Sequence, residues 1–211
     1  MKILVTGANG FVATHIIQQL LAEGHAVVGT IRNRAKQPQI FDNVTYVVAN
    51  LTSAEGWLDA MTDVEAILHV ASPLGRENAN NPQLIDEAIS GVTIVFEAAK
   101  KAGVKRIVMT SSQAAATPLA HTTGIIDETF WSDAENPELN AYRLSKLFAE
   151  QTAWSLAQQY DLQVTTILPV ALKGMSLITR FSPLIAASMT ACGDNENLNN
   201  NTHTINARES A

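Results

Sequence analysis

Short apolar runs alternate with helical apolar spacings along most of the chain. Six runs predict β-strands, and between them apolar residues recur every three or four positions, as on one face of a helix. The expected strands are residues 2–6, 26–31, 44–49, 66–70, 106–110 and 163–168, and the expected helices are residues 11–21, 53–60 (capped by Ser53), 82–102 and 138–160. Alternating strands and helices are typical of a parallel sheet with helices on both faces. The pattern therefore predicts an α/β protein with a doubly wound parallel sheet.

The composition fits a globular protein. A chain of 211 residues with 46% hydrophobic and 16% charged residues can bury the core of one domain, with or without an appendage. The net charge of −6 argues against nucleic acid or an anionic membrane as the main partner. Cys192 is the only cysteine, which excludes an internal disulfide framework, and no apolar segment suits a signal peptide or a membrane span. We therefore expect a cytoplasmic protein.

The end of the chain has a different character. Residues 193–201 are rich in asparagine and almost free of apolar side chains, a composition typical of segments that do not fold. We expect one folded domain over residues 1–174, followed by a divergent, poorly ordered tail over residues 175–211.

The first expected strand ends in a glycine turn of the form GxxGxxA. Gly7 would permit the tight turn, Gly10 the close approach of a pyrophosphate, and Ala13 close packing of the helix on the sheet. The N-terminus of the next helix would direct its N–H groups and its positive dipole at the phosphates. Strand, glycine turn and helix in this order indicate a dinucleotide site, and the alternative is a glycine turn that binds nothing.

The end of the second expected strand carries bases where an NAD-binding protein would carry an acid. An Asp or Glu there would hold the ribose 2′-hydroxyl, but residues 31–36 contain no acid and three bases. A guanidinium suits a 2′-phosphate, so we predict NADP(H), held first by Arg32 and second by Lys36. The alternative is a solvated basic loop. Asn50 and Leu51, at the end of the third strand, are expected near the adenine.

Tyr142 and Lys146 lie four positions apart on the last expected helix, so their side chains would be neighbours on its surface. A cation beside the phenol would lower its pKa toward the range of acid–base catalysis. Ser111 and Ser112 follow the fifth strand, where a hydroxyl can donate a hydrogen bond to a substrate carbonyl. The alternatives are a solvated Tyr–Lys pair and serines that only end a strand. His69, inside a strand, is expected in the core, and no metal site is predicted.

Three motifs together resemble the extended short-chain dehydrogenase/reductases of the NAD-dependent epimerase/dehydratase superfamily. They are Thr6-Gly7-Ala8-Asn9-Gly10-Phe11, Thr110-Ser111-Ser112 and Tyr142-x-x-x-Lys146, and the match spans residues 2–174. His69-Val70-Ala71-Ser72-Pro73 and residues 97–106 are similar to the branch of the dihydroflavonol reductases, cinnamoyl-CoA reductases and aldehyde/ketone reductases. The resemblance implies a Rossmann fold and NADP(H)-dependent reduction of a small-molecule ketone or aldehyde, by a monomer or a homodimer.

The resemblance also implies the roles of individual residues. Ser112 would polarise the carbonyl, Tyr142 would exchange the proton, and Lys146 would lower the pKa of the tyrosine and hold the nicotinamide ribose. Ser112 is preferred to Ser111 because it directly precedes the run that Gln113 begins. The implied cofactor positions are Gly7, Gly10, Phe11, Arg32, Lys36, Asn50, Leu51, Val70, Ala71, Tyr142, Lys146 and Pro169.

Two alternatives to a reductase follow from departures from the family pattern. Family members continue past Leu168-Pro169 into a substrate lobe, which this chain largely lacks. That leaves open a catalytically impaired NADP-binding remnant or regulator. A nucleotide-sugar epimerase or dehydratase on the same scaffold is the other alternative, although Gln113-Ala114-Ala115-Ala116 lacks the continuation expected there.

Overall fold

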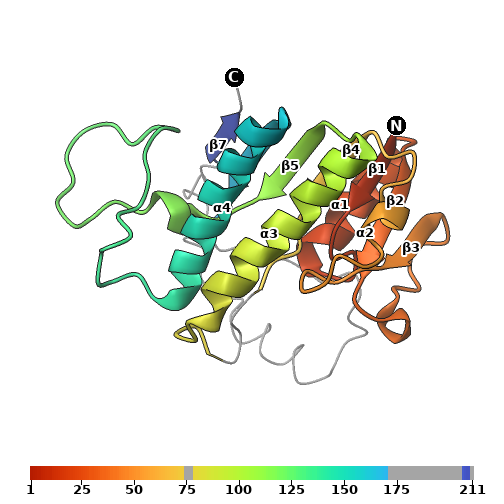
Figure 1. Ribbon diagram of the computed structural model, residues 1–211, viewed down its shortest axis with the longest axis horizontal. Coiled ribbons are helices and arrows are strands. Elements are labelled where there is room, and N and C mark those ends of the chain that lie inside the picture. The colour runs from red at the N-terminus through yellow and green to blue at the C-terminus, as the bar shows by residue number, and fades with distance from the viewer. Residues whose placement is uncertain (74–77, 171–205, 210–211) are drawn as a thin grey trace, which may run out of the picture.

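A seven-stranded sheet forms the centre of the protein in the computed structural model, which describes residues 1–73, 78–170 and 206–209 (Figure 1). The strands are β1 Lys2–Val5, β2 Ala26–Ile31, β3 Val44–Val48, β4 Ala66–His69, β5 Arg106–Thr110, β6 Gln163–Leu168 and β7 Asn206–Glu209. The strands β1 to β6 pair in parallel, and β7 pairs antiparallel with β6. Valine, isoleucine and leucine dominate the parallel strands because helices cover such sheets and bury them.

Helices cover both faces of this sheet. They are α1 Phe11–Ala22, α2 Trp57–Ala60, α3 Gln83–Ala102 and α4 Ala141–Tyr160, with short 3₁₀ turns η1 Arg34–Lys36 and η2 Gln113–Ala116. Neighbouring strand residues point to opposite faces. Leu4 and Val28 accordingly join the core beneath α2, α3 and α4, whereas Val5 and Val27 pack with Ile17 of α1. The helices α3 and α4 run side by side across their face of the sheet (Figure 1).

The strand order makes this a Rossmann-type, doubly wound sheet. The order is β3-β2-β1-β4-β5-β6-β7, so the chain moves outward from β1 to β3 and then crosses back to place β4 on the other side of β1. Ligands of such folds bind at the carboxyl ends of the strands where the order reverses, here between β1 and β4. The predicted fold class is confirmed, and it fixes where a site should be sought.

The predicted helix at residues 53–60 is wrong over its first half, because α2 begins only at Trp57. The Ser53 hydroxyl accepts the N–H of Glu55 at 3.2 Å within a turn, and Gly56, with φ of 80°, precedes the helix. This left-handed residue approaches β3 so closely that an added Cβ would lie 2.1 Å from the carbonyl oxygen of Val48. In this turn, any residue with a side chain at position 56 would therefore collide with the end of β3.

Strand β7 differs from the structure predicted for this part of the chain. Asn206–Glu209 lies within the segment predicted to be a poorly ordered tail, yet it adds an antiparallel edge strand to β6. The other residues of that segment, including the asparagine-rich run, lie outside the described residues. The domain boundary at residue 174 stays a prediction.

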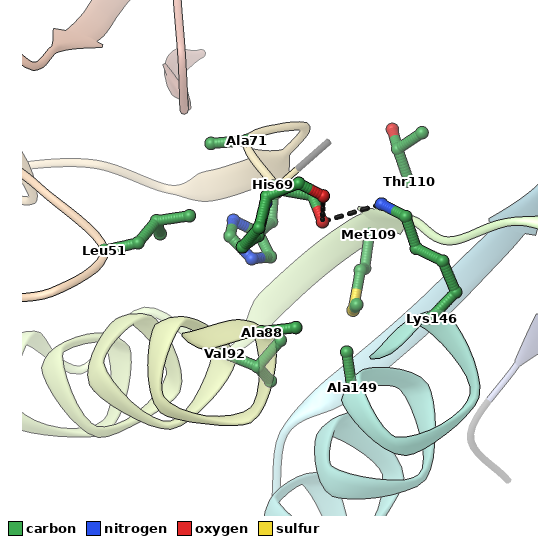
Figure 2. A pocket seen from close by; sticks show the side chains of 11 residues that line it. Leu51, His69, Ala71, Ala88, Val92, Met109, Thr110, Lys146 and Ala149 are labelled. Atoms are coloured by element: carbon green, nitrogen blue, oxygen red, sulfur yellow. Dashed lines mark hydrogen bonds between the residues drawn. The ribbon is translucent and has the colours of Figure 1, made fainter. Parts of the chain in front are cut away.

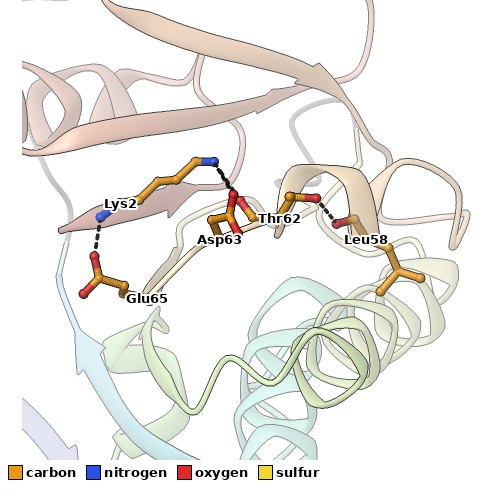
Figure 3. A network of polar contacts seen from close by, with 5 residues as sticks. All are labelled: Lys2, Leu58, Thr62, Asp63 and Glu65. Atoms are coloured by element: carbon orange, nitrogen blue, oxygen red, sulfur yellow. Dashed lines mark hydrogen bonds and ion pairs between the residues drawn. The ribbon is translucent and has the colours of Figure 1, made fainter.

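Polar contacts tie the start of β1 to the loop between α2 and β4 (Figure 3). The backbone N–H of Lys2 donates to Glu65 Oε1 at 2.8 Å, and the Lys2 amine donates to the carbonyl of Thr62 at 2.7 Å. The same amine is 4.0 Å from Asp63 Oδ2, an exposed ion pair that contributes little stability. These contacts lie at the amino ends of the strands, away from the carboxyl ends where a ligand would bind.

A long connection links η2 to α4 and extends away from the helical layers (Figure 1). Its residue Ile125 is 92% exposed, which is unusual for a large apolar side chain. None of the described helices is both long and apolar enough to cross a lipid bilayer.

Replacing Gly56 with alanine should cost more stability than the same replacement at Gly24. Both glycines are left-handed, with φ of 80° and 79°, so each alanine bears a conformational cost of about 1–2 kcal/mol. Only at Gly56 would the new Cβ meet backbone, since nothing lies within 4 Å of a Cβ at Gly24. Urea unfolding should show a loss for Gly56→Ala that exceeds the loss for Gly24→Ala by at least about 1 kcal/mol. Equal losses would contradict the close approach to β3.

Candidate active site

The carboxyl ends of β1 and β4 meet at the point where the strand order reverses. The hydroxyl of Thr6 accepts the backbone N–H groups of Val70 and Ala71, both at 2.9 Å. Gly7 follows at once, and an added Cβ on it would lie 3.1 Å from the Cβ of Ala71. The absence of a side chain at Gly7 thus lets the first turn lie directly against the turn after β4.

The glycine turn has the features that a pyrophosphate needs. Gly7 has φ of 67°, and the N–H of Gly10 donates back to the carbonyl of Gly7 at 2.8 Å, which closes the turn. Gly10 is the N-cap of α1, and its extended backbone brings no side chain to the helix end. No acidic residue lies in the first turn of α1, so an anion would meet the positive helix end without competition there. The geometry of this turn is compatible with a dinucleotide phosphate, and the cofactor roles of Gly7, Gly10 and Phe11 stay predictions.

The predicted 2′-phosphate residues lie at the end of β2. Arg32 and Lys36 are both exposed, and η1 begins between them. The side chain of Asn33 accepts the N–H of Ala35 at 2.9 Å, so the turn is capped from within and its cationic side chains extend into solvent. The arrangement leaves both cations accessible to an anion.

The remaining predicted cofactor residues follow β3, β4 and β6. Asn50 is exposed, and its carbonyl accepts the indole N–H of Trp57 at 3.0 Å, which fixes the loop after β3. Leu51 and Ala71 line one small cavity, so the loops after β3 and β4 approach each other, and their contacts with a cofactor stay predictions. The carbonyl of Pro169 accepts the N–H of Gln113 at 3.0 Å and so joins the loop after β6 to the end of β5.

Helix α4 brings Tyr142 and Lys146 to this edge of the sheet. Its N-cap is Asn140, whose side chain accepts the N–H of Arg143 at 2.9 Å, so the helix begins one residue before Tyr142. The Lys146 amine lies 5.4 Å from the centre of the Tyr142 ring, within the range of a cation–π contact. Lys146 is 6% exposed, and this burial lowers the pKa of its amine to about 8. The amine therefore titrates close to neutral pH.

The pKa of Tyr142 is not lowered, contrary to what its spacing from Lys146 led us to expect. Burial raises the pKa of the Tyr142 phenol, because removing the ring from water penalises the phenolate. The ammonium contact is with the ring, and its attraction does not offset this desolvation. Tyr142 is consequently protonated at neutral pH, which is the form that can donate a proton.

The two serines after β5 have different environments. Ser111 is buried and donates to Glu150 Oε2 at 2.5 Å, so its hydroxyl belongs to the interior. Ser112 is half-buried, and its hydroxyl oxygen accepts the N–H of Ala114 at 3.2 Å to cap η2. Accepting that bond uses an oxygen lone pair and leaves the hydroxyl hydrogen for another acceptor. This difference favours Ser112 over Ser111 as the serine that would contact a substrate.

Sequence reasoning missed Glu150, which is fully buried. Besides Ser111, the hydroxyl of Thr166 donates to its Oε1 at 2.7 Å, and the indole N–H of Trp154 approaches the same oxygen at 3.4 Å. One carboxylate on α4 thereby holds the ends of both β5 and β6. Its position four residues after Lys146 was visible in the sequence, but a glutamate on a helix is ordinarily a surface residue.

A cavity of about 10 Å³ lies beneath the Lys146 amine, between the ends of β4 and β5 and the helices α3 and α4 (Figure 2). Such a volume holds about one water molecule. Lys146 reaches from α4 across the end of β5, and its amine donates to Ser72 Oγ at 2.6 Å. Ser72 is the second residue that sequence reasoning missed, because nothing in the chain pattern pairs it with Lys146.

His69 borders the same cavity and is buried, which confirms its predicted place in the core. Burial, followed by repulsion from the Lys146 charge, lowers the pKa of His69 to about 4. The imidazole is therefore neutral at physiological pH. Among the described residues, no group of three or more histidine, cysteine or carboxylate side chains is arranged to hold a metal ion.

Comparison with known proteins points to one family. The NAD dependent epimerase/dehydratase family matches residues 3–202. Among curated relatives, an anthocyanidin reductase of Vitis vinifera is 31% identical over 214 residues, covering 93% of this chain and 63% of the relative. The fatty acid hydroxylase uhd1 of Mycosarcoma maydis is 30% identical over 197 residues, covering 89% and 65% of the two chains.

Solved structures agree with these sequence matches. The yeast methylglyoxal/isovaleraldehyde reductase Gre2, complexed with NADPH, superposes with a TM-score of 0.74 at 27% identity. The match covers 84% of this chain and 60% of that one. The chain thus spans less than two thirds of the length of these relatives.

Replacing Lys146 with methionine should stabilise the protein at neutral pH. The ordinary pKa of 10.5 holds in the unfolded chain and falls to about 8 in the folded one, so below pH 8 the folded protein bears the cost of a buried charge. Between these values the unfolded state binds more protons, and wild-type stability rises with pH. The variant should be more stable by roughly 3 kcal/mol at neutral pH, an advantage that shrinks as the pH rises toward 10.5.

The measurement is urea unfolding of both proteins at a series of pH values. Lys101→Met is the matched control, because the side chain of Lys101 is 63% exposed and pairs only weakly with Glu97. Its stability difference from wild type should not change over this pH interval. A pH-independent difference for Lys146→Met would show that the amine is not desolvated as described.

Proposed function

The chain belongs to the NAD-dependent epimerase/dehydratase family, and on that premise we propose that it is an NADPH-dependent reductase of a ketone or aldehyde. The observation that carries the proposal is the pairing of Tyr142 with Lys146 at the carboxyl edge of the sheet, beside the point where the strand order reverses. The anthocyanidin reductase relative and the NADPH complex of Gre2 support the same reaction class.

The cofactor would lie across the carboxyl ends of β1 to β4. Gly7 and Gly10 would admit the pyrophosphate, and the N-terminus of α1 would offer its N–H groups and dipole. Arg32 would hold the 2′-phosphate, with Lys36 as the second cation, since both are exposed at the end of β2. The loops that carry Asn50, Leu51, Val70 and Ala71 would flank the adenosine half, and Pro169 would lie at the nicotinamide end.

Bound NADPH would supply the hydride. The proton would come from Tyr142, which is protonated at neutral pH and would neutralise the charge developing on the carbonyl oxygen. Ser112 would donate its hydroxyl hydrogen to the same oxygen, while its own oxygen accepts from Ala114. The Lys146 cation beside the ring would stabilise the phenolate that proton transfer leaves behind.

A second candidate is a protein that binds NADP(H) without turnover. The chain spans 63% and 65% of the length of the two curated relatives named above. These relatives therefore contain residues that the match does not reach. If the part of the relatives that this chain does not match supplies their substrate walls, the residues that the structure describes would bind the nucleotide and catalyse nothing. NADPH binding by calorimetry, without NADPH oxidation on any aldehyde or ketone of a broad panel, would favour this candidate.

Tyr142→Phe should abolish carbonyl reduction. Removing the phenolic hydroxyl takes away the proton donor, and general acids of this kind contribute about 10²–10⁴-fold to a rate. NADPH oxidation with the best carbonyl of the panel measures the loss, and calorimetry should show that NADPH still binds. Tyr160→Phe is the matched control, because Tyr160 lies at the far end of α4 against Lys100 and should leave the rate unchanged. Full activity of Tyr142→Phe would exclude the mechanism.

Arg32→Ala should weaken NADPH far more than NADH. Losing a guanidinium–phosphate contact costs about tenfold or more in affinity, and NADH has no 2′-phosphate to lose. Fluorescence titration with each cofactor gives the two dissociation constants. Arg106→Ala, an exposed arginine at the amino end of β5, should change neither. An equal loss for both cofactors in Arg32→Ala would contradict 2′-phosphate recognition.

A further inference from the structure

The Lys146 ammonium is buried, yet one hydroxyl supplies its hydrogen-bond acceptor in the part of the chain that the structure describes. Its amine donates to Ser72 Oγ at 2.6 Å, a short distance typical of a charge-assisted bond. An ammonium has three donors and no acceptor, so a buried lysine needs oxygen atoms around it. Ser72 is therefore well placed to compensate the desolvation of this charge.

The position of Ser72 is set by the turn after β4. Thr6 Oγ1 accepts two backbone N–H groups, from Val70 and Ala71, which leaves its single hydrogen for Nδ1 of His69 at 3.0 Å. Thr6, directly after β1, thus fixes the backbone immediately before Ser72 through two hydrogen bonds and holds the His69 ring through a third. The hydroxyl of Ser72 is then held between the Lys146 amine and its own neighbour, the carbonyl of Pro73 at 3.5 Å.

The other groups around the amine do not replace Ser72. His69, from β4, accepts the Thr6 hydrogen and is neutral, so it neither pairs with the cation nor competes with it at neutral pH. Tyr142, from α4, meets the amine through its ring. Glu150, also on α4, has both carboxylate oxygens bonded to Ser111 and Thr166. The cavity wall beneath the amine is completed by Met109 and Thr110 of β5, Ala88 and Val92 of α3, and Ala149 of α4.

We propose that Ser72 is a positioning residue, which holds the Lys146 ammonium in its charged form beside the Tyr142 ring. The proposal rests on the proposed function for its catalytic meaning, because Lys146 acts there through Tyr142. Ser72 itself touches neither the proton that Tyr142 donates nor the carbonyl that receives it. Its effect is transmitted by a single hydrogen bond to the amine.

Titration of Lys146 tests the proposal without cofactor or substrate. In protein labelled with ¹³Cε-lysine, the NMR signal that disappears in Lys146→Arg belongs to Lys146, and its shift follows the protonation of the amine. Ser72→Ala removes the acceptor and should move the Lys146 midpoint downward by about one pH unit. A midpoint equal to that of wild type would overturn the proposal.

A matched pair of variants distinguishes the loss of the Ser72 hydroxyl from a general disturbance of the turn. Threonine and valine have nearly the same shape, but only threonine has the hydroxyl. Ser72→Thr should keep the wild-type midpoint, whereas Ser72→Val should behave like Ser72→Ala. Equal midpoints for the threonine and valine variants would overturn the proposal even if Ser72→Ala fails to fold.

Steady-state kinetics test whether the hydrogen bond from Lys146 to Ser72 affects the reaction rate. With NADPH and an accepted carbonyl, kcat of Ser72→Val should fall about tenfold relative to Ser72→Thr, with a smaller change in KM for NADPH. The alkaline limb of its pH profile should move down with the NMR midpoint. Absence of turnover by the wild type would remove the reductase proposal but leave the NMR result to decide the role of Ser72. Identical kcat values and pH profiles in an active pair would overturn that role.

Discussion

The hydroxyl of Thr6 ties together the two strand ends on which the candidate site depends. Parallel strands on either side of a reversal in strand order diverge into loops on opposite faces, so nothing in the sheet itself fixes those loops relative to one another. Thr6 supplies that restraint by accepting from Val70 and Ala71 and donating to His69. The bare backbone of Gly7 then permits the two turns to touch. Placement of the turn after β4, and so of Ser72 against Lys146, follows from this one side chain.

Helix α4 buries two ionisable side chains one turn apart, and the desolvation of each is compensated in a different way. Lys146 points to the turn after β4, where Ser72 provides its acceptor, whereas Glu150 points to β5 and β6 and collects hydroxyls from Ser111 and Thr166. Burying such groups costs free energy that an apolar residue would not. The hydrogen bonds of Glu150 in return fix the distance between α4 and the end of β5, which Ser111 and Ser112 follow. The desolvation of Lys146 is only partly compensated, so the pKa of its amine is lowered. Perturbed pKa values of this kind are more typical of functional groups than of structural ones.

The strands and helices could be predicted from the sequence because short apolar runs that alternate with helical apolar spacings fit few structures other than a parallel sheet covered by helices. The bounds of β2, β5 and β6 equal the predicted ones, and α1, α3 and α4 differ by one to three residues at their ends. The start of α2 could not be predicted, since it depends on how closely Gly56 approaches Val48, a contact between segments. The same reason explains the missed roles of Ser72 and Glu150, whose partners lie 74 and 39 residues away. The residues of the glycine turn and the Tyr142–Lys146 pair were found because their spacing is local, but the direction of the Tyr142 pKa shift was not, because it follows from burial.

The ionisable groups around the Lys146 amine differ in their protonation at neutral pH. Between the lowered pKa of His69, about 4, and that of Lys146, about 8, the imidazole is neutral and the amine carries the local positive charge. Tyr142 is protonated throughout this interval, and its pKa lies above that of an ordinary tyrosine. A carbonyl oxygen gaining negative charge there would meet a proton donor backed by a cation, in a protein whose net charge is otherwise −6. Proton donation by Tyr142 would leave a phenolate, which burial disfavours, and the Lys146 cation beside the ring is the group that would offset this cost.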